Sequence, residues 1–162
     1  MMIAVFEDGN GAAAMLQSLK SREKKGLFRL FNAAVLVKDE TGKTTTKETL
    51  DLESGRGALF GALVGGLIGM LGGPAGALIG AAAGAATGGI TAGKVDLGFS
   101  NQFLSEIQKY LKPGCSALVL IVEKNSIEPV VAEFEQQHTK LFRHVVKTEI
   151  AQRFMESDQE SI

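Results

Sequence analysis

Residues 57–93 have the sequence GALFGALVGGLIGMLGGPAGALIGAAAGAATGGITAG, in which no side chain is charged. Glycine recurs in this segment at every fourth position, in two successive series. The first series is Gly57, Gly61, Gly65, Gly69 and Gly73, and the second is Gly72, Gly76, Gly80, Gly84 and Gly88. Because residues four apart stay on one slowly rotating stripe of an α-helix, each series predicts a helix with a flat glycine face.

The two predicted helices form a hairpin, because Gly72-Gly73-Pro74 lies between them. Adjacent glycines followed by proline end a helix and begin a turn. A glycine face lets a second backbone approach closely enough for Cα–H···O contacts, as in glycine-zipper helix pairs. In water each such glycine costs about 0.8–1 kcal/mol of helix stability relative to alanine, so neither arm is expected to be stable alone. We therefore interpret these glycines as residues for helix packing or oligomerisation.

Two surroundings are open to the hairpin, a lipid bilayer or other copies of the protein. As helices, residues 56–71 and 74–93 would rise about 24 Å and about 30 Å, close to the thickness of a hydrocarbon core. The first arm has enough large apolar residues to insert. The second relies on Leu78, Ile79 and Ile90 and is expected to insert only together with the first. A flexible linker is disfavoured, because linkers are rich in polar residues.

The sequence before the hairpin predicts a β-α-β-β order. The four elements are a strand over residues 3–6, a helix that ends at Gly26, a strand within residues 27–39 and a strand over residues 44–52. Asp8 is a suitable N-cap for the helix, and a glycine preceded by lysine is typical of a helix end. The turn Thr41-Gly42-Lys43 joins the last two strands, which we expect to pair antiparallel.

The sequence after the hairpin predicts an α-β-α-β order, followed by a short helix over residues 150–155. The elements are a helix from Ser100 to Leu111, a buried strand over residues 117–122, a helix from residue 127 and a strand over residues 141–149. Ser100 is expected to cap the first helix and Lys112-Pro113-Gly114 to end it. Asn125 or Ser126 is expected to cap the next helix.

Together these elements predict an α+β protein with an antiparallel sheet. Residues 1–55 and 95–162 form a split, ferredoxin-like domain in this interpretation, and residues 56–94 form an inserted helical hairpin. The order is then β-α-β-β, hairpin, α-β-α-β. The predicted core lies outside the hairpin and consists of Val5, Leu16, Val35, Leu36, Leu104, Ile107, Leu118, Leu120, Val122, Val131 and Phe134.

Composition excludes several classes of function. The net charge of the 162 residues is −1, so no overall positive field would recruit nucleic acid. Cys115 is the single cysteine, which rules out an internal disulfide and a multi-cysteine metal site. The two histidines, His138 and His144, are too few for a histidine-rich metal site. We therefore expect no enzymatic activity, no cofactor and no bound metal, and the sequence identifies no small-molecule substrate.

Three short motifs resemble nucleotide-binding sites without meeting their requirements. Residues 9–14 match G-x-G-x-x-A, but the next strand is expected to be antiparallel, whereas a dinucleotide site needs a parallel one. Residues 88–94 approach a P-loop, but Val95 replaces the required Ser or Thr. Gly42-Lys43-Thr44 has only the end of that motif. A thiol–imidazole pair of Cys115 with a histidine is also disfavoured, because Cys115 begins a buried strand.

The chain resembles the DUF1269 family of uncharacterised bacterial and archaeal proteins, which are often described as membrane proteins. The features that it shares are the N-terminal β-α-β-β unit, the central glycine zipper, and the segments Gly98–Phe103 and Leu111–Leu118. Cys115 departs from the family pattern, in which a small residue is usual at that position. The resemblance implies the architecture, and it implies no reaction, cofactor or catalytic residue.

The sequence thus predicts a non-enzymatic, membrane-associated protein whose hairpin anchors or assembles a cytoplasmic α+β domain. Its expected partners are other copies of itself and the lipid bilayer, at the cytoplasmic face of the membrane. Arg56 and Lys94 at the two ends of the hairpin, and an N-terminus without an export signal, agree with that side. The basic run 22–25 is either a solvated helix end or a contact with anionic headgroups. The alternative function is a soluble homo-oligomeric scaffold or sensor, with the hairpin buried between protomers.

Overall fold

The computed structural model describes residues 1–49, 56–72, 99–137, 139–146 and 152. The chain divides into two compact units, each of which is described by itself. The first unit comprises Met1–Leu50 and Ser105–His144, and the second comprises Asp51–Leu104 and Val145–Ile162. The predicted second arm of the hairpin (74–93) lies outside the described residues, as do the end of the strand over 44–52 and, apart from Gln152, the terminal helix.

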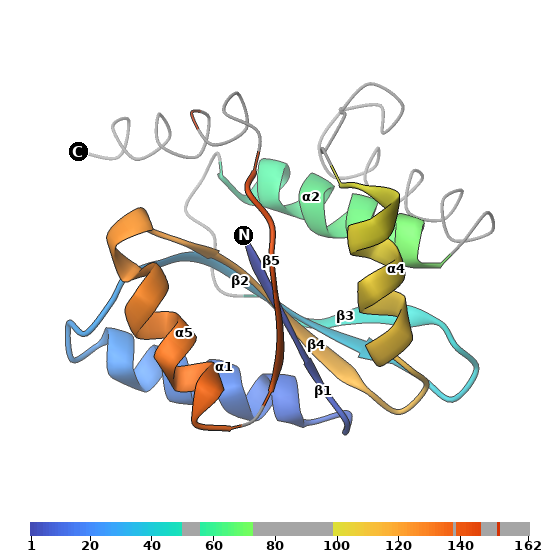
Figure 1. The fold of residues 1–162 in the computed structure, drawn as a ribbon, viewed down its shortest axis with the longest axis horizontal. Helices are drawn as coiled ribbons and strands as arrows, with labels where there is room; N and C mark the ends of the chain where they lie inside the picture. Colours follow the sequence, from blue (N-terminus) through green and yellow to red (C-terminus); the bar gives the residue numbers. More distant parts are fainter. Residues whose placement is uncertain (50–55, 73–98, 138, 147–151, 153–162) are drawn as a thin grey trace. The chain divides into compact units, whose positions relative to one another are not determined.

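The first unit is built on a five-stranded sheet in which every neighbouring pair of strands is antiparallel. The strands are β1 (Met2–Phe6), β2 (Leu30–Lys38), β3 (Thr44–Thr49), β4 (Ser116–Val122) and β5 (Lys140–Arg143). Their order across the sheet is β3-β2-β4-β1-β5 (Figure 1). The predicted α+β class, its antiparallel sheet and the pairing of β2 with β3 are therefore confirmed.

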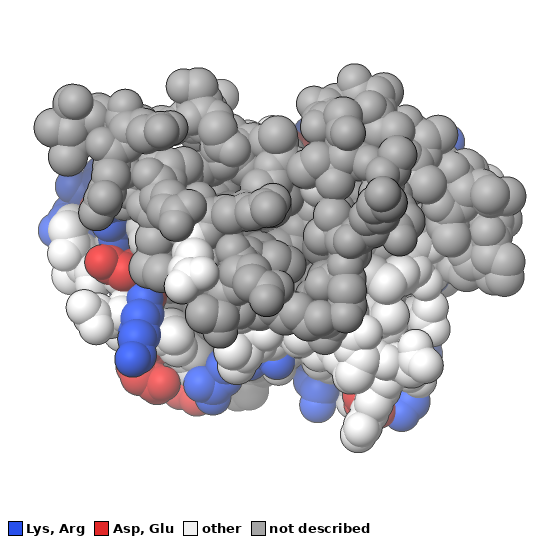
Figure 2. Space-filling model, turned by 90° about the horizontal axis from the view of Figure 1, so that it is seen from above, with Lys and Arg blue, Asp and Glu red and all other residues white. Residues whose placement is uncertain are grey.

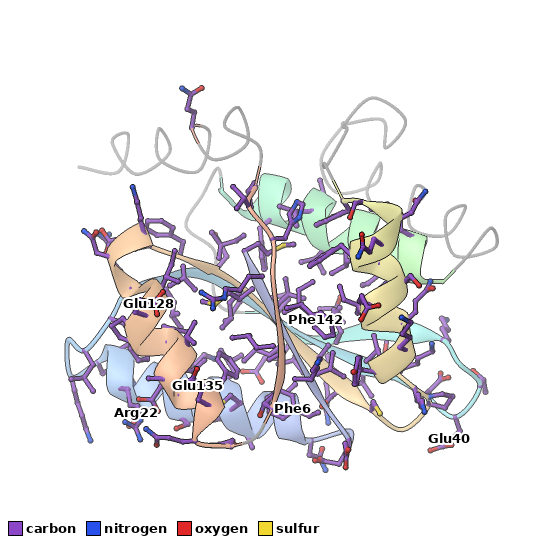
Figure 3. The ribbon with its side chains drawn as sticks, in the orientation of Figure 1. Phe6, Arg22, Glu40, Glu128, Glu135 and Phe142 are labelled. Atoms are coloured by element: carbon purple, nitrogen blue, oxygen red, sulfur yellow. The ribbon has the colours of Figure 1, made fainter. Side chains whose placement is uncertain are left out.

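Two helices, α1 (Gly11–Glu23) and α5 (Ile127–Glu135), cover one face of this sheet. Leu16 and Leu19 of α1 and Phe134 of α5 belong to the same buried cluster as Leu118 and Leu120 of β4. The two helices lie side by side in Figure 1. An ion pair of 2.8 Å between Arg22 Nη1 of α1 and Glu133 Oε1 of α5 joins them. Arg22 is labelled on α1 in Figure 3.

Each of these helices connects two parallel strands across a strand that lies between them. β1 and β2 are both antiparallel to β4, so α1 joins two strands of the same direction with β4 between them. In the same way, α5 joins β4 to β5 with β1 between them. Every predicted core residue is buried, except that Val122 is half-buried and packs against the cluster.

The opposite face of the sheet carries the alternate residues of the central strands. Ile3, Leu36 and Val119 on this face are fully buried. The C-terminal part of α4 (Asn101–Tyr110) contributes Tyr110, whose ring centroid lies 5.7 Å from that of Phe142 on β5. The Lys38 ammonium of β2 donates a hydrogen bond of 3.1 Å to the carbonyl of Leu111, just beyond α4.

The structure corrects two of the predicted helix caps and confirms a third, and α5 begins at Ile127 as predicted. α1 begins at Gly11 with Asn10 at the N-cap position, and Asp8 Oδ1 instead accepts the backbone N–H groups of Asn10 and Gly11. Ser100 caps α4 as predicted, because its Oγ accepts the backbone N–H of Phe103 at 3.1 Å. Ser126 does not cap α5 with its side chain. Its Oγ accepts the backbone N–H of Arg29 at 2.8 Å, so this hydroxyl joins two loops.

The last strand is shorter than the sequence predicts. β5 ends at Arg143 after four residues, whereas the apolar pattern predicts a strand from residue 141 to residue 149. Residues 144–146 are described and are not part of a strand, and residues 147–151 lie outside the described residues. Backbone hydrogen bonds continue one residue beyond β5, because the Met1 amino group donates to the His144 carbonyl at 2.9 Å and the His144 N–H donates to the Met1 carbonyl at 3.0 Å.

Candidate functional site

The first arm of the glycine segment is a helix, α2 (Arg56–Leu71), as the four-residue repeat predicts. Its large apolar side chains fall on one stripe, at helical spacing of three and four residues. The buried members of this stripe are Phe60, Leu63, Val64, Leu67 and Leu71. The helix therefore has one face that is packed through large side chains. Gly57, Gly61, Gly65 and Gly69 lie on a different stripe, displaced from it around the helix axis.

The glycine stripe of α2 begins as an open surface. Gly61 is exposed, and a Cβ atom added there would have no heavy-atom neighbour within 4 Å. Gly65 is half-buried and Gly69 is buried. Gly72 follows the helix, and its N–H donates a hydrogen bond of 2.9 Å to the carbonyl of Ile68. The first part of the stripe is thus free for a further helix, whose backbone could approach because Gly61 has no side chain.

The remaining predicted packing residues cannot be placed. Gly73, Gly76, Gly80, Gly84 and Gly88 lie outside the described residues. The second glycine series therefore stays a prediction, together with the hairpin that it would complete. Within the described parts of the chain, the structure contains no helix that combines the length and the apolar character required to cross a membrane.

The first unit also contains an open hollow with a volume of about 1070 Å³. The end of β1, the turn after α4 and the start of β5 enclose it. The residues that line it are Val5, Phe6, Glu7, Asp8, Lys109, Tyr110, Lys112, Pro113, Cys115, Gln137, Thr139 and Lys140. Phe6 is labelled at this end of the sheet in Figure 3. Acidic and basic side chains both line the hollow, so its charge does not favour one class of ligand.

Most of the polar groups in this hollow already have partners. Lys140 Nζ lies 4.9 Å from the centroid of the Tyr110 ring. Lys109 Nζ bonds Glu106 Oε1 at 2.5 Å, and this hydrogen bond raises the pKa of Lys109 above its usual value and lowers that of Glu106. The Asp8 carboxylate accepts hydrogen bonds from the backbone N–H groups of Asn10 and Gly11, at the start of α1. Within the described part of the hollow, Lys109, Lys140 and Asp8 are thus engaged by other groups and do not form a nucleophile–base pair.

Cys115 lies at this hollow as a free and nearly buried thiol, with 8% of its surface exposed. His138, one of its two conceivable partners, lies outside the described residues. Among the residues that the structure does describe, no three His, Cys, Asp or Glu side chains gather into a group that could hold a metal ion. The prediction that Cys115 is a small buried residue agrees with its position.

The glycine motif over residues 9–14 has a structural explanation. A Cβ atom on Gly11 would lie 2.7 Å from Cβ of Phe6, so the helix can start this close to β1 only with glycine at that position. The neighbours of β1 in the sheet are β4 and β5, and both are antiparallel to it. A dinucleotide site needs a parallel neighbour at this point. The motif therefore serves packing.

Sequence patterns did not identify Ser116, a fully buried residue that joins β4 to the start of α1. Its Oγ donates a hydrogen bond of 2.6 Å to the carbonyl of Asp8 and accepts one of 3.1 Å from the backbone N–H of Ala12. The sequence feature that could have indicated its role is a serine at the first position of an otherwise apolar strand. Asn32 is also buried, with 1% of its surface exposed, and within the described residues its side-chain amide has no hydrogen-bond partner.

On the face that Figure 2 shows, the described charged residues of the two signs lie next to each other. Among the exposed or half-exposed pairs are Lys20 with Glu48 at 3.0 Å and Arg143 with Glu128 at 3.7 Å. Such pairs contribute little to stability because water screens them.

Comparison with known proteins identifies a family. Residues 58–157 match the model of a protein family described as "Protein of unknown function (DUF1269)". The match includes α2, α4, β4, α5 and β5, and it does not include β1, α1, β2 and β3. No curated protein and no solved structure matches the chain.

Proposed function

Because this match spans more than half of its residues, the chain belongs to the DUF1269 family, and we propose that it is a non-enzymatic assembly protein, anchored at a membrane. In this proposal residues 57–93 pack against the same segment of other copies through their glycine faces. The same segment holds the α+β domain at the cytoplasmic face of a lipid bilayer. The proposal assigns no catalytic role to residues 57–93, because this segment contains no charged side chain.

The open glycine stripe of α2 carries this proposal. The buried stripe of the helix uses its large side chains, which leaves the surface at Gly61 without a neighbour within 4 Å. Glycine in a helix is costly in water, and a row of glycines is favourable only where another backbone packs on it. A second copy of α2 supplies such a backbone, with an identical glycine row for mutual close approach.

The apolar character of α2 supports the membrane part of the proposal. Ala62, Ile68 and Met70 lie outside the buried stripe and are only half-buried. Apolar surface on every side of a helix is stable against lipid or against other apolar helices, and not against water. The second arm contributes the rest of the hairpin in this proposal.

For the soluble part of the chain, we propose a ferredoxin-like arrangement with an inserted segment. The support is the pair of crossovers, in which α1 joins β1 to β2 around β4 and α5 joins β4 to β5 around β1. Two such split β-α-β units define that fold. The helix that makes the second crossover is α5, and α4 precedes it as part of the insertion between β3 and β4.

Cell fractionation tests the proposed function. We expect the full-length protein in the membrane pellet, released by detergent and retained after washing with high salt or alkaline carbonate. Detergent extracts should contain particles larger than a monomer. Recovery of a monomer in the soluble fraction, without detergent, would contradict both the anchoring and the assembly.

A second candidate function is a soluble homo-oligomeric scaffold, and the exposed strand β3 favours it. β3 lies at the edge of the sheet, where it pairs with β2 alone. An exposed edge is a template for pairing with a second chain, although Lys47 in the middle of β3 opposes it. The same fractionation distinguishes this candidate, because it predicts a soluble particle of high mass.

A further inference from the structure

The loop that follows α1 presents a leucine side chain to the outside of the first unit. Leu27 has 54% of its surface exposed, whereas the next residue, Phe28, is buried in the cluster under α1 and α5. Exposed large apolar side chains are few in the described part of the chain, and the others, Tyr110 and Val145, lie elsewhere in the sequence. Leu27 is thus one of three exposed large apolar residues in the described part of the chain, and its charged surroundings distinguish it.

The backbone around Leu27 is firmly held. Gly26 has a φ of +74°, which favours glycine, and its N–H bonds the carbonyl of Glu23 at 2.8 Å. The N–H of Leu27 bonds the carbonyl of Arg22 at 3.4 Å. These two bonds form a Schellman motif, in which the residue after the glycine usually packs back on its own helix. Leu27 does not do so, since it remains more than half exposed.

The residues that follow hold the loop in place from its other side. Glu23 Oε1 accepts the N–H of Leu30 at 2.7 Å, and Ser126 Oγ accepts the N–H of Arg29 at 2.8 Å. The carbonyl of Arg29 accepts the N–H of Glu123 at 3.3 Å. Leu27 is thus fixed between a capped helix and a buried phenylalanine, and its exposure is built into the fold.

Positive charge surrounds this leucine. Residues 22–29 contain four basic side chains, Arg22, Lys24, Lys25 and Arg29, and one acidic side chain, Glu23, which gives a net charge of +3. Glu23 is occupied by the backbone of Leu30. Lys24 and Lys25 are exposed, and neither side chain forms an ion pair with any described residue. The turn Lys124–Ser126, which bonds the loop through Ser126, adds the exposed Lys124.

The described acidic groups nearby form no ion pair with Lys24, Lys25 or Lys124. Glu133 is paired with Arg22 at 2.8 Å, and Glu128 lies 3.7 Å from Arg143. Glu123 is half-buried. The surface formed by Lys24, Lys25, Leu27, Arg29 and Lys124 is here termed the basic loop surface. It combines three lysine side chains that form no ion pair with a described residue and one projecting apolar side chain. Arg29 is itself oriented by the ring of Phe31, with its guanidinium carbon 5.8 Å from the ring centroid.

We propose that the basic loop surface binds the anionic headgroups of a lipid bilayer, with Leu27 inserted between them. Lysine and arginine side chains are attracted to the negative surface potential of an anionic membrane. Transfer of one aliphatic side chain from water into the lipid is also favourable. The inference extends the proposed membrane association, on which it rests, by stating which part of the first unit contacts the lipid.

A fluorescence experiment tests this proposal directly, because the natural chain contains no tryptophan. Leu27→Trp places one indole in the basic loop surface of the full-length protein. We expect its emission to shift to the blue when vesicles of phosphatidylcholine and phosphatidylserine are added, and to be quenched by brominated acyl chains. Vesicles of phosphatidylcholine alone should give a small shift, and 1 M salt should reverse the shift, since the Debye length is then about 3 Å.

Matched variants separate the loop from the rest of the chain. Gln136→Trp places the indole on an exposed residue beyond α5 and should show no shift with either vesicle. In the Leu27→Trp background, the double substitution Lys24→Gln with Lys25→Gln should weaken binding to the phosphatidylserine vesicles. The lipid concentration that gives half of the emission shift should rise roughly 30-fold, which is about fivefold for each lysine. Lys43→Gln with Lys47→Gln removes the same charge from the region of β3 and should change it little.

The outcomes distinguish this inference from the proposed function. If the protein pellets with vesicles but the Leu27→Trp emission does not move, the loop inference is overturned and the anchoring by residues 57–93 stands. If the emission shifts equally with neutral and anionic vesicles, headgroup recognition is wrong. If it shifts only with phosphatidylserine while alkaline carbonate releases the protein from the vesicles, the loop inference holds and insertion of residues 57–93 is wrong.

Discussion

Gly11 illustrates how a single missing side chain sets the position of a helix. A Cβ atom there would lie 2.7 Å from Cβ and 2.9 Å from Cγ of Phe6, closer than such atoms are found in proteins. At Gly9, two residues earlier, an added Cβ would meet the carbonyl oxygen of Gly114 at 3.6 Å, which is an ordinary contact. A side chain would therefore fit at Gly9 but would collide with Phe6 at Gly11, although both glycines belong to the same sequence motif.

We expect Gly11→Ala to lower the free energy of unfolding by about 1–3 kcal/mol, because the start of α1 has to move away from Phe6. Gly9→Ala is the matched control and should change stability by less than about 0.5 kcal/mol. Urea denaturation followed by circular dichroism measures both. Equal stability of the two variants would show that the start of α1 adjusts without cost.

Ser116 is the other residue whose role depends on a distant contact. Its hydroxyl satisfies the carbonyl of Asp8 and the N–H of Ala12, both more than a hundred residues away. Ser116→Ala leaves these buried backbone groups without their partner, which should cost about 1–3 kcal/mol of unfolding free energy. Thr45→Ala, on the exposed strand β3, serves as the control and should have little effect. The same urea titration measures the difference, and the account of Ser116 is wrong if both variants match the wild type.

At this scale the sequence predicts burial well and specific hydrogen bonds poorly. Leu16, Val35 and Leu118 were assigned to the core because apolar periodicity marks the inner face of each element. The bonds of Ser116 and Ser126 join segments that are far apart in the chain, and no local pattern reveals them. Ser126 was accordingly expected to cap α5, and it bonds the loop at Arg29 instead.

Among the elements, the turn between β2 and β3 shows how a side chain can fix a hairpin. Asp39 Oδ1 accepts hydrogen bonds from the Thr41 hydroxyl at 2.6 Å, the Thr41 N–H at 2.9 Å and the Lys43 N–H at 3.0 Å. The Thr41 hydroxyl, followed by the Lys43 N–H, lowers the pKa of Asp39 below its usual value. Gly42, with a φ of +83°, completes the turn.

This pKa shift predicts a pH dependence with a definite sign. A carboxylate whose pKa is lowered by folding stabilises the protein above its unfolded-state pKa, and loses that contribution as the pH falls through the folded-state pKa. Asp39→Ala should therefore destabilise the protein at pH 7, and its difference from the wild type should shrink below about pH 4. Urea titrations from pH 3 to pH 7 measure it. A difference that grows on acidification would contradict this account of the turn.

Helix α2 shows what a repeat in the sequence can and cannot predict. The four-residue spacing predicted the helix, because glycines and leucines each keep to their own stripe. The spacing could not predict which stripe is buried, since either glycines or large side chains can form a packed face. In the structure the buried stripe is that of Phe60, Leu63 and Leu67. The difference matters, because it leaves Gly61 available to a partner.

On the scale of the whole molecule, the hydrophobic cluster under α1 and α5 belongs to the first unit. Every residue of the cluster under α1 and α5 comes from Met1–Leu50 or Ser105–His144. The sequence predicted the α+β class and the antiparallel sheet. It did not predict the extent of β5, which ends at Arg143.

Replacement of residues 57–93 by a short Gly/Ser loop should leave a folded protein, because the core cluster lies outside that segment. We expect a cooperative thermal transition and a circular dichroism spectrum of mixed helix and sheet. Loss of cooperative unfolding at every concentration would show that the segment is part of the core. The Gly11→Ala version of the shortened protein gives a control, since it should melt at a lower temperature.

The central claim is that copies of the protein assemble through the glycine stripe of residues 57–93, and Gly61→Leu tests it most directly. A Cβ atom added at Gly61 would have no heavy-atom neighbour within 4 Å beyond its own helix backbone, so the leucine begins in open space and is expected to obstruct a partner that packs on this face. Ala62→Leu adds the same side chain one position away and controls for hydrophobicity. The decisive measurement is the mass of the detergent-extracted particle by light scattering, corrected for bound detergent. We predict an oligomer for the wild type and for Ala62→Leu, and a smaller particle for Gly61→Leu with its membrane association retained. An unchanged oligomer in Gly61→Leu would contradict the claim.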